Sequence, residues 1–498
     1  MSEFPAYDEV HVISDIHMGG KPGFQILGKT ARLANYIRWV AAQRPGGRVA
    51  LVLNGDVFDT LAEDIRGYVA VDEATATLTR IMNDPSFSGI WDALADFVKT
   101  KGRTLVIVIG NHDIEVSFPP VQRLIQSRLA GEDLDARARI EFSTTGAGYT
   151  CLVGNTRVFC THGNEVDAWN YNRYEDLARV ARRLNAGLTL DPKEWYPNAG
   201  TRMVKEVMND VKRRYAWIDL LKPETSAAVG TLVVLDPSQV VKINNLLSIL
   251  GERQKGSKQV DQRLSAEGFR PREETGAPAV TVDQLLGPNV AAGLRFGASP
   301  GTRNADDMLL AAEKNFRHRG APVTPPNQTL GTGGLIWDRL TGWINGVGKD
   351  EALRRALKDW LAEDKTFDIT NQDDTYKQVT ASVGASTDFI VNGHTHLERA
   401  IDMGGSRYYF NCGTWIRLMR FTEAMLKDTA SFKPVYEVLT DGTMAAIDNA
   451  MFGGEPFVLD QTSAVSITLE DGKTVGRLTH VEGDGSDAPK VIKQFARP

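Results

Sequence analysis

Short apolar runs that end directly in polar side chains recur five times along the chain. Each run is long enough for one strand, and the residues that follow it are Asp, Asn or His. The five runs cover residues 9–14, 49–53, 105–109, 157–161 and 388–392. We therefore predict five buried strands, each of which delivers polar side chains to the loop at its end.

Helical periodicity separates the first three of these strands. Apolar residues recur at helical spacing in 31–42 and in 72–100, and 121–129 has the same pattern. Strands that alternate with helices are typical of layered α/β proteins. The amino-terminal part of the chain is therefore predicted to be such a layered unit.

Tight-turn signals predict three hairpins further along the chain. Gly154-Asn155 separates strand patterns at 149–153 and 157–161, and Asp471-Gly472 separates 465–469 from 474–478. Asp441-Gly442 stands in the same way between 435–439 and 444–447. A further short strand is expected at 140–143, and the polar tail beyond residue 482 is expected to be loose.

Residues 169–380 have a different pattern, with helical spacing and no cluster of ligand-type side chains. Helices are predicted at 174–188, 202–221, 237–250, 336–347 and 351–361, and 252–307 is predicted to be a long loop rich in Gly and Pro. We expect a discontinuous core, 1–168 and 381–450, and a mainly helical insertion, 169–380, that acts as a substrate lid. Residues 451–498 are expected to form a β-hairpin extension and a loose tail.

Composition limits the partners and the compartment. The chain has 498 residues and a net charge of -6, so its overall charge provides no general electrostatic attraction to nucleic acid. Three cysteines are too few and too oddly counted for a disulfide framework, which favours a reducing, cytoplasmic location. No run approaches the ~20 apolar residues of a spanning helix, a pattern that leaves room for peripheral membrane contact only. The sequence indicates no oligomeric state.

The five polar clusters combine carboxylate, imidazole and carboxamide groups without thiolate. This donor set suits Mn, Fe, Zn, Co or Ni, and we expect two divalent ions, with manganese preferred. Two ions roughly 3.5 to 4 Å apart would share a carboxylate, activate a hydroxide and neutralise charge on a phosphoryl group. Asp56, directly after the second strand, is the carboxylate expected between them.

The motifs in these clusters resemble those of the calcineurin-like metallophosphoesterases. They are Asp15-x-His17, Gly55-Asp56-x-x-Asp59, Gly110-Asn111-His112-Asp113, His162-Gly163 and Gly393-His394-Thr-His396. The resemblance implies a four-layer αββα sandwich, here with a large helical insertion. It also implies that Asp15, His17, Asp56 and His396 hold one ion and that Asp56, Asn111, His162 and His394 hold the other. By the same resemblance, His112 protonates the leaving oxygen and Asp59 orients it.

The form Gly-Asp-x-Phe-Asp at 55–59 is similar to a bacterial branch that includes the UDP-2,3-diacylglucosamine pyrophosphohydrolases. The function expected from this is hydrolysis of a phosphodiester or pyrophosphate bond by a metal-bound hydroxide, in a small-molecule or lipid-linked substrate. Phosphomonoesterase and nuclease activities are the alternatives, although the net charge disfavours a nuclease. A non-catalytic binding protein is disfavoured because His112 is present.

Substrate contacts are expected just after the fourth motif, at Asp167, Asn170 and Arg173. Two basic groups, at 179–183 and 212–214, could meet substrate phosphate or form solvated helix faces. The solvated face is the favoured interpretation of both groups.

Overall fold

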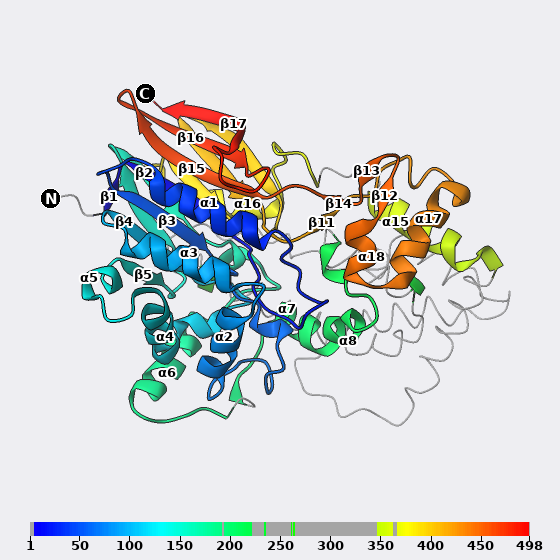
Figure 1. Ribbon diagram of the computed structural model, residues 1–498, viewed down its shortest axis with the longest axis horizontal. Coiled ribbons are helices and arrows are strands. Elements are labelled where there is room, and N and C mark those ends of the chain that lie inside the picture. The colour runs from blue at the N-terminus through cyan, green and yellow to red at the C-terminus, as the bar shows by residue number, and fades with distance from the viewer. Residues whose placement is uncertain are drawn as a thin grey trace.

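The computed structural model describes residues 4–191, 194–221, 346–361 and 366–497, together with residues 234, 235, 260, 262 and 263 (Figure 1). The predicted helix 237–250 lies outside the described residues. So do most of the predicted helix 336–347 and most of the predicted loop 252–307.

A seven-stranded sheet carries the first three predicted strands. Its order is β17-β16-β15-β2-β3-β4-β5, with β2 to β5 parallel and β15 to β17 antiparallel. All six residues of β3 are buried, as expected for a parallel strand covered on both faces. The strands are β2 (Glu9–Ile13), β3 (Val49–Asn54), β4 (Arg103–Val108), β5 (Ile140–Ser143), β15 (Ser463–Glu470), β16 (Lys473–His480) and β17 (Lys490–Arg497).

A six-stranded sheet, of order β1-β6-β7-β8-β10-β9, packs face to face with the first. Val52 and Val106 of one sheet share a buried cluster with Cys160, Phe389 and Phe410 of the other. Its strands are β1 (Ala6–Tyr7), β6 (Tyr149–Val153), β7 (Thr156–Cys160), β8 (Phe389–Asn392), β9 (Glu398–Gly404) and β10 (Arg407–Cys412). The hairpins predicted at Gly154 and at Gly472 are confirmed.

Helices cover the outer faces of both sheets. Buried residues such as Trp91 and Phe97 attach one helical layer to the seven-stranded sheet, and Val379 of α16 packs against Ile390 and Tyr409 of the six-stranded sheet. The helices are α1 (Thr30–Ala42), α2 (Ala74–Asn83), α3 (Ser88–Lys99), α4 (Pro119–Ala130), α5 (Leu134–Arg137), α6 (Tyr174–Asn185) and α16 (Asp374–Ala381). The predicted four-layer sandwich is therefore confirmed. No described helix has the length and apolar character needed to cross a membrane.

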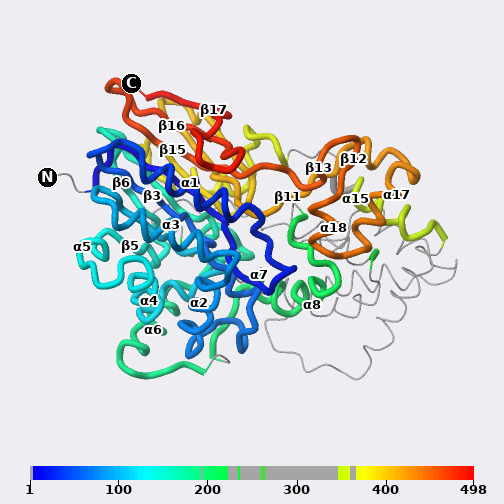
Figure 2. The backbone as a smooth tube through the Cα atoms, in the orientation of Figure 1, coloured from blue at the N-terminus to red at the C-terminus, as the bar shows by residue number. Residues whose placement is uncertain are grey.

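A second lobe lies beside the sandwich, where green and orange segments meet in Figure 2. It has its own hydrophobic core, in which Trp217, Leu353 and Phe432 are buried. Its elements are α7 (Ala199–Met203), the π-helical turn η5 (Val204–Met208), α8 (Asn209–Lys212), the 3-10 turn η6 (Ile218–Leu220), α15 (Lys349–Leu361), β11 (Leu418–Met419), α17 (Thr429–Asp441), α18 (Met444–Asn449), β12 (Met451–Phe452), β13 (Glu455–Pro456) and β14 (Val458–Leu459). Apolar packing thus groups 416–459 with helices of the predicted insertion.

Two local predictions were wrong. Asp441-Gly442 joins two helices, because Gly442 has a φ of 81° and ends α17 in the left-handed conformation, and the Thr443 side chain caps α18. A positive-φ glycine fits a hairpin turn and a helix end equally well.

The tail beyond residue 482 is not loose, because β17 pairs with β16 and Phe495 stacks on Tyr408 with ring centroids 4.8 Å apart.

The predicted helix 202–221 is also interrupted. It is divided into α7, η5, α8 and η6, with a turn between the last two. A π-helical turn inside a helix is often found at a functional site. This interrupted segment lies against the cavity described below.

Candidate metal centre

The five predicted clusters meet at one place in the sandwich. Parallel pairing of β2, β3 and β4 brings the loops after these strands to the same edge of the seven-stranded sheet. β7 and β8, also parallel to each other, bring their loops there from the six-stranded sheet. Side chains that are far apart in the sequence therefore become neighbours.

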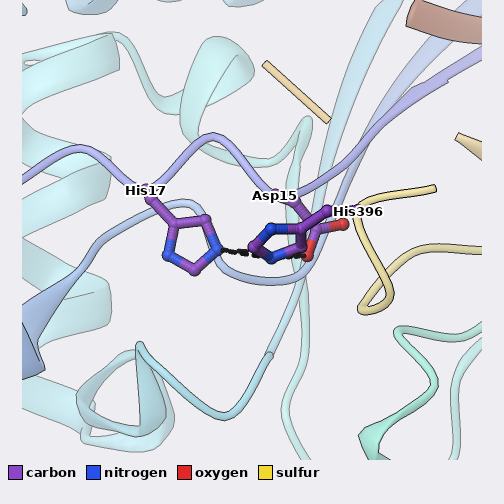
Figure 3. A group of neighbouring side chains, drawn as sticks. All are labelled: Asp15, His17 and His396. Atoms are coloured by element: carbon purple, nitrogen blue, oxygen red, sulfur yellow. Dashed lines mark hydrogen bonds and ion pairs between the residues drawn. The ribbon is translucent and has the colours of Figure 1, made fainter. Parts of the chain in front are cut away.

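The first group of neighbours consists of Asp15, His17 and His396 (Figure 3). His396 Nε2 lies 3.2 Å from Asp15 Oδ1 and 3.1 Å from His17 Nε2. The other oxygen, Asp15 Oδ2, accepts a hydrogen bond from the His394 backbone N–H at 2.9 Å. All three side chains are buried.

The second group consists of Asp56, His162 and His394. Asp56 Oδ2 lies 3.2 Å from His162 Nε2 and also 3.7 Å from His17 Nε2, so this carboxylate stands between the two groups. Asn111 is buried and lines the same cavity. The two groups consist of Asp and His residues to which the motif resemblance assigned the two ions. A third group of neighbours, His17, Asp59 and His112, overlaps the first group at His17.

His112 and Asp59 form a pair at the edge of the two groups. His112 Nδ1 lies 3.0 Å from Asp59 Oδ1, and the His112 backbone N–H donates to Asp56 Oδ1 at 2.8 Å. Burial raises the pKa of Asp59, but the neighbouring His112 outweighs it and holds that pKa well below its usual range. Asp59 is thus an ionised acceptor that orients the His112 ring.

Backbone strain is concentrated in these loops. Among the described residues, eight that are not glycine have a positive φ, and five of them are Asp15, His17, Asp56, His394 and His396. Such a conformation costs on the order of 1–3 kcal/mol for a residue with a side chain. It persists where the surroundings impose it, and it is common at functional sites.

Asp15 and His17 are in the protonation states that bind a metal, whereas His162 is not. Burial raises the pKa of Asp15, but the nearby His396 lowers it to about 2, so this carboxylate is ionised at neutral pH. Burial, helped by the charge of His112, lowers the pKa of His17 to about 3, so its ring is neutral. Burial opposes a charge on His162, but Asp56 raises its pKa to about 10, so a bound ion would have to displace a proton there.

The motif residues rest on polar neighbours that the motifs did not include. Asn54, at the end of β3, accepts at its carbonyl from His162 Nδ1 at 2.8 Å and from Ser14 Oγ at 3.0 Å. The Asn54 side chain donates to the Thr161 carbonyl at 2.8 Å, which ties the two sheets together. Polar residues at the ends of otherwise apolar strands were a usable sequence signal for these supports.

One glycine is required by close packing rather than by its φ. A Cβ atom on Gly110 would lie 2.0 Å from Asp56 Oδ1. The third motif therefore needs glycine here so that its loop can approach the Asp56 carboxylate.

A cavity opens over the two groups and His112, and the second lobe provides its opposite wall. Trp169, Met203, Met208 and Ile218 make much of that wall apolar, and Asp219 is also part of it. The remaining lining residues are His17, Ile26, Asp56, Asp59, Asn111, His112, Asn170, Gly200, Val204, His394 and His396. The sequence predicted a substrate lid in 169–380 but not which of its residues line the cavity, because that depends on long-range packing.

Of the three residues predicted to contact substrate, two lie at the site and one does not. Asp167 Oδ2 lies 2.8 Å from His394 Nε2 and accepts from Asn170 Nδ2 at 2.7 Å. Both residues are thus at the site, and Asn170 lines the cavity. Arg173 is not brought there: it pairs with Asp176 at 3.4 Å and its guanidinium lies over the Tyr196 ring, 4.5 Å from the ring centroid.

The residues present fit two divalent cations. Within the described part of the chain, Asn111 Oδ1 is buried and forms no hydrogen bond, as expected for an atom reserved for a metal. His162 Nε2 is buried too, and its neighbour at 3.2 Å is Oδ2 of Asp56, the carboxylate shared by the two groups. Asp167 is placed to hold the His394 ring through its second nitrogen, an arrangement common around metal-binding histidines. The donor set of carboxylate, imidazole and carboxamide oxygen suits borderline or hard ions.

The chain was compared with known proteins. The family model of calcineurin-like phosphoesterases matches residues 9–221, which carry four of the five motifs. That family consists of metal-dependent phosphoester hydrolases, so the match supports both the predicted enzyme class and the sandwich fold. No curated protein matches the chain.

Proposed function

We propose that this metallophosphoesterase hydrolyses phosphodiester or pyrophosphate bonds at a centre of two divalent cations. The observation that carries the proposal is the convergence of two ligand groups that share Asp56, beside the His112–Asp59 pair. Such a set supplies what phosphoryl transfer needs, namely positioning, charge neutralisation and a proton for the leaving group.

Each ion would be held by residues from both sheets. Asp15, His17 and His396 would hold one and Asn111, His162 and His394 the other, with Asp56 shared. When bound, the two cations would activate a water and neutralise charge on the phosphoryl oxygens. We expect manganese, since this donor set suits it and the site has no thiolate.

His112 would supply the proton that the leaving oxygen takes up. Its Nδ1 lies 3.0 Å from Oδ1 of the ionised Asp59, to which Nδ1–H would donate, and the His112 ring lines the cavity. The ring is thereby fixed in one orientation and one tautomer. Asp59 does not need to contact the substrate for this role.

The second lobe would select the leaving group. Met203, Met208 and Ile218 face the ligand groups across the cavity. A wall of this kind suits a small-molecule or lipid-linked ester with an apolar portion better than a highly charged polymer. This is the role of the substrate lid that we expect for part of the insertion.

Hydrolysis of bis(p-nitrophenyl) phosphate, compared with p-nitrophenyl phosphate, tests the proposal. Protein stripped of metal should be inactive and should hydrolyse the diester once manganese is restored. Asp56→Asn should lower kcat by roughly a hundredfold or more, because both ions lose a shared ligand. Asp64→Asn, which changes an exposed carboxylate on the same loop, is the matched control and should leave the rate unchanged.

Each other result points to a different function. Hydrolysis of the monoester alone would favour a phosphomonoesterase. Cleavage of DNA or RNA that falls steeply with salt would favour the nuclease. Turnover by the Asp56→Asn protein equal to wild type would disprove the assigned centre.

A further inference from the structure

Lys212 is buried, although its sequence context favoured a solvated helix face. Its side chain is 11% exposed, whereas the side chain of the next residue, Arg213, is 79% exposed. The Lys212 ammonium forms an ion pair with the carboxylate of Asp219. A buried lysine requires a neighbouring anion, because removing its charge from water costs several kcal/mol.

The Asp219 side of this ion pair lies at the wall of the cavity. It lines the cavity on the second-lobe side, together with Asp59 and His112 on the sandwich side. Through Asp219, Lys212 is therefore one side chain away from the cavity that His112 also lines.

The surroundings make an anionic ligand the natural partner of Lys212. The other second-lobe residues that line the cavity, including Met203, Met208 and Ile218, carry no charge. An unpaired Asp219 carboxylate in this wall would repel a phosphate ester. Pairing with Lys212 removes that repulsion, and moving the ammonium from Asp219 to the substrate would turn it into attraction.

We propose that Lys212 binds the departing phosphoryl group of a pyrophosphate-linked substrate, for which it gives up Asp219. The inference rests on the proposed function and narrows its substrate class from phosphodiesters in general to diesters of pyrophosphate. A positive charge released into the cavity that His112 lines would stabilise a leaving group that is itself a phosphate.

The reaction converts a pyrophosphate diester and water into two phosphate monoesters. The water oxygen forms a bond to one phosphorus, and the bridging P–O bond breaks with its electron pair left on the departing phosphoryl oxygen. That oxygen takes a proton from His112, and the proton that the water gives up restores the ring. The incoming oxygen keeps its second hydrogen.

Two adenylated substrates test the inference in manganese-loaded protein. Diadenosine diphosphate contains a pyrophosphate, and the p-nitrophenyl ester of adenosine monophosphate contains a single phosphoryl group. Lys212→Gln should raise KM for diadenosine diphosphate by about tenfold or more, with a smaller change in kcat and no change for the nitrophenyl ester. Lys212→Arg should recover part of the loss, because it keeps the charge.

Asp219→Asn should change KM for diadenosine diphosphate in the opposite direction to Lys212→Gln. It removes the carboxylate that competes for the ammonium, so KM for diadenosine diphosphate should fall. Arg213→Gln is the matched control, since it changes a neighbouring but exposed cation whose partner is Asp210. Thermal melting of each variant verifies that it is folded.

The outcomes separate the two proposals. Equal losses on both substrates in Lys212→Gln would make the ion pair structural and overturn the inference, as would a wild-type protein that cleaves only the nitrophenyl ester. If the loaded protein cleaved neither of these and no bis(p-nitrophenyl) phosphate, the proposed function itself would fall, and the inference with it.

Discussion

Some side chains at the cavity need not touch the reacting atoms, because they act through a neighbouring side chain that does. Asp59 is the clearest case, because its carboxylate accepts from His112 Nδ1 at 3.0 Å and from the Ala62 backbone N–H at 3.2 Å. The sequence predicted this pairing only through the resemblance of its motif. It did not predict the hydrogen bond from Ser14 to the Asn54 carbonyl of the neighbouring strand. Nor did it predict the bond from the Asn54 side chain to Thr161, which depends on where the second sheet lies.

Asp59→Asn should lower kcat by about 10- to 100-fold with little change in KM, because the His112 ring loses its anionic acceptor. The loss should be larger for a diester with a poorly acidic leaving alcohol than for one that releases p-nitrophenol. Steady-state kinetics on both esters check this. In a double-mutant cycle, Asp59→Asn should cost little more once His112→Gln is present; additive losses would contradict the pairing.

A second buried carboxylate, Glu115, links stability to pH. Burial raises its pKa to about 7, although the Ala70 N–H and the Thr60 hydroxyl both donate to it. Because the folded pKa exceeds the unfolded one, the folded protein holds more protons between roughly pH 4.5 and 7. The contribution to stability is therefore complete below that window and is lost as pH rises through it.

Glu115→Gln should remove this dependence. The stability of the wild type minus that of the variant should fall by on the order of 2 kcal/mol between about pH 5 and pH 8. Urea denaturation of metal-free protein at several pH values measures the difference without interference from metal loss. A difference that stays constant or grows with pH would contradict the assignment.

At the scale of elements, the strands and the motifs that end them could be predicted from the sequence, and the second lobe could not. A strand that ends in ligand residues is a local pattern, and it identified β2, β3, β4, β7 and β8. The helices α17 and α18 share their turn signal with a hairpin, and only packing on 199–221 decides between the two. The burial of Lys212 could not be predicted for the same reason, since it comes from tertiary packing.

Gly442 tests this turn between helices. Its φ of 81° is strained for any residue with a side chain, and a Cβ atom there would lie 2.0 Å from the Arg214 carbonyl oxygen. Gly442→Ala should therefore destabilise the protein by more than the roughly 1 kcal/mol of backbone strain alone. Thermal melting of the variant and of the wild type measures this loss of stability. Gly453→Ala, at a φ of 64° with open space around the site, should show only the smaller cost.

For the whole molecule, the candidate metal ligands and the apolar wall of the cavity belong to two different hydrophobic cores. The candidate ligands all belong to the sandwich, while the apolar cavity wall belongs largely to the second lobe. Trp217 is fully buried in that lobe and donates from Nε1 to the Leu439 carbonyl at 3.0 Å. Its removal should affect one lobe and spare the other.

Trp217→Ala should destabilise the protein by about 3–5 kcal/mol and raise KM, because the wall loses its support. The number of bound metal ions should stay the same as in wild type. Chemical denaturation and metal analysis of the purified variant test both expectations. Met451→Ala, an exposed change in the same lobe, should alter neither. Loss of metal would show that the two lobes are not separable in this way.

The pairing of β2 with β15 joins residues near the two ends of the chain, and this has a consequence for biosynthesis. Residues 14–462 separate the two strands, and at about 5–20 residues per second a ribosome needs on the order of 20–90 s to add them. Throughout that time one edge of the nascent sheet stays open to unwanted pairing. His394 and His396 also emerge late, so metal cannot complete its ligand set on the ribosome until most of the protein exists. Folding of this protein is therefore expected to depend on chaperones that shield the amino-terminal strands until the carboxyl-terminal ones arrive.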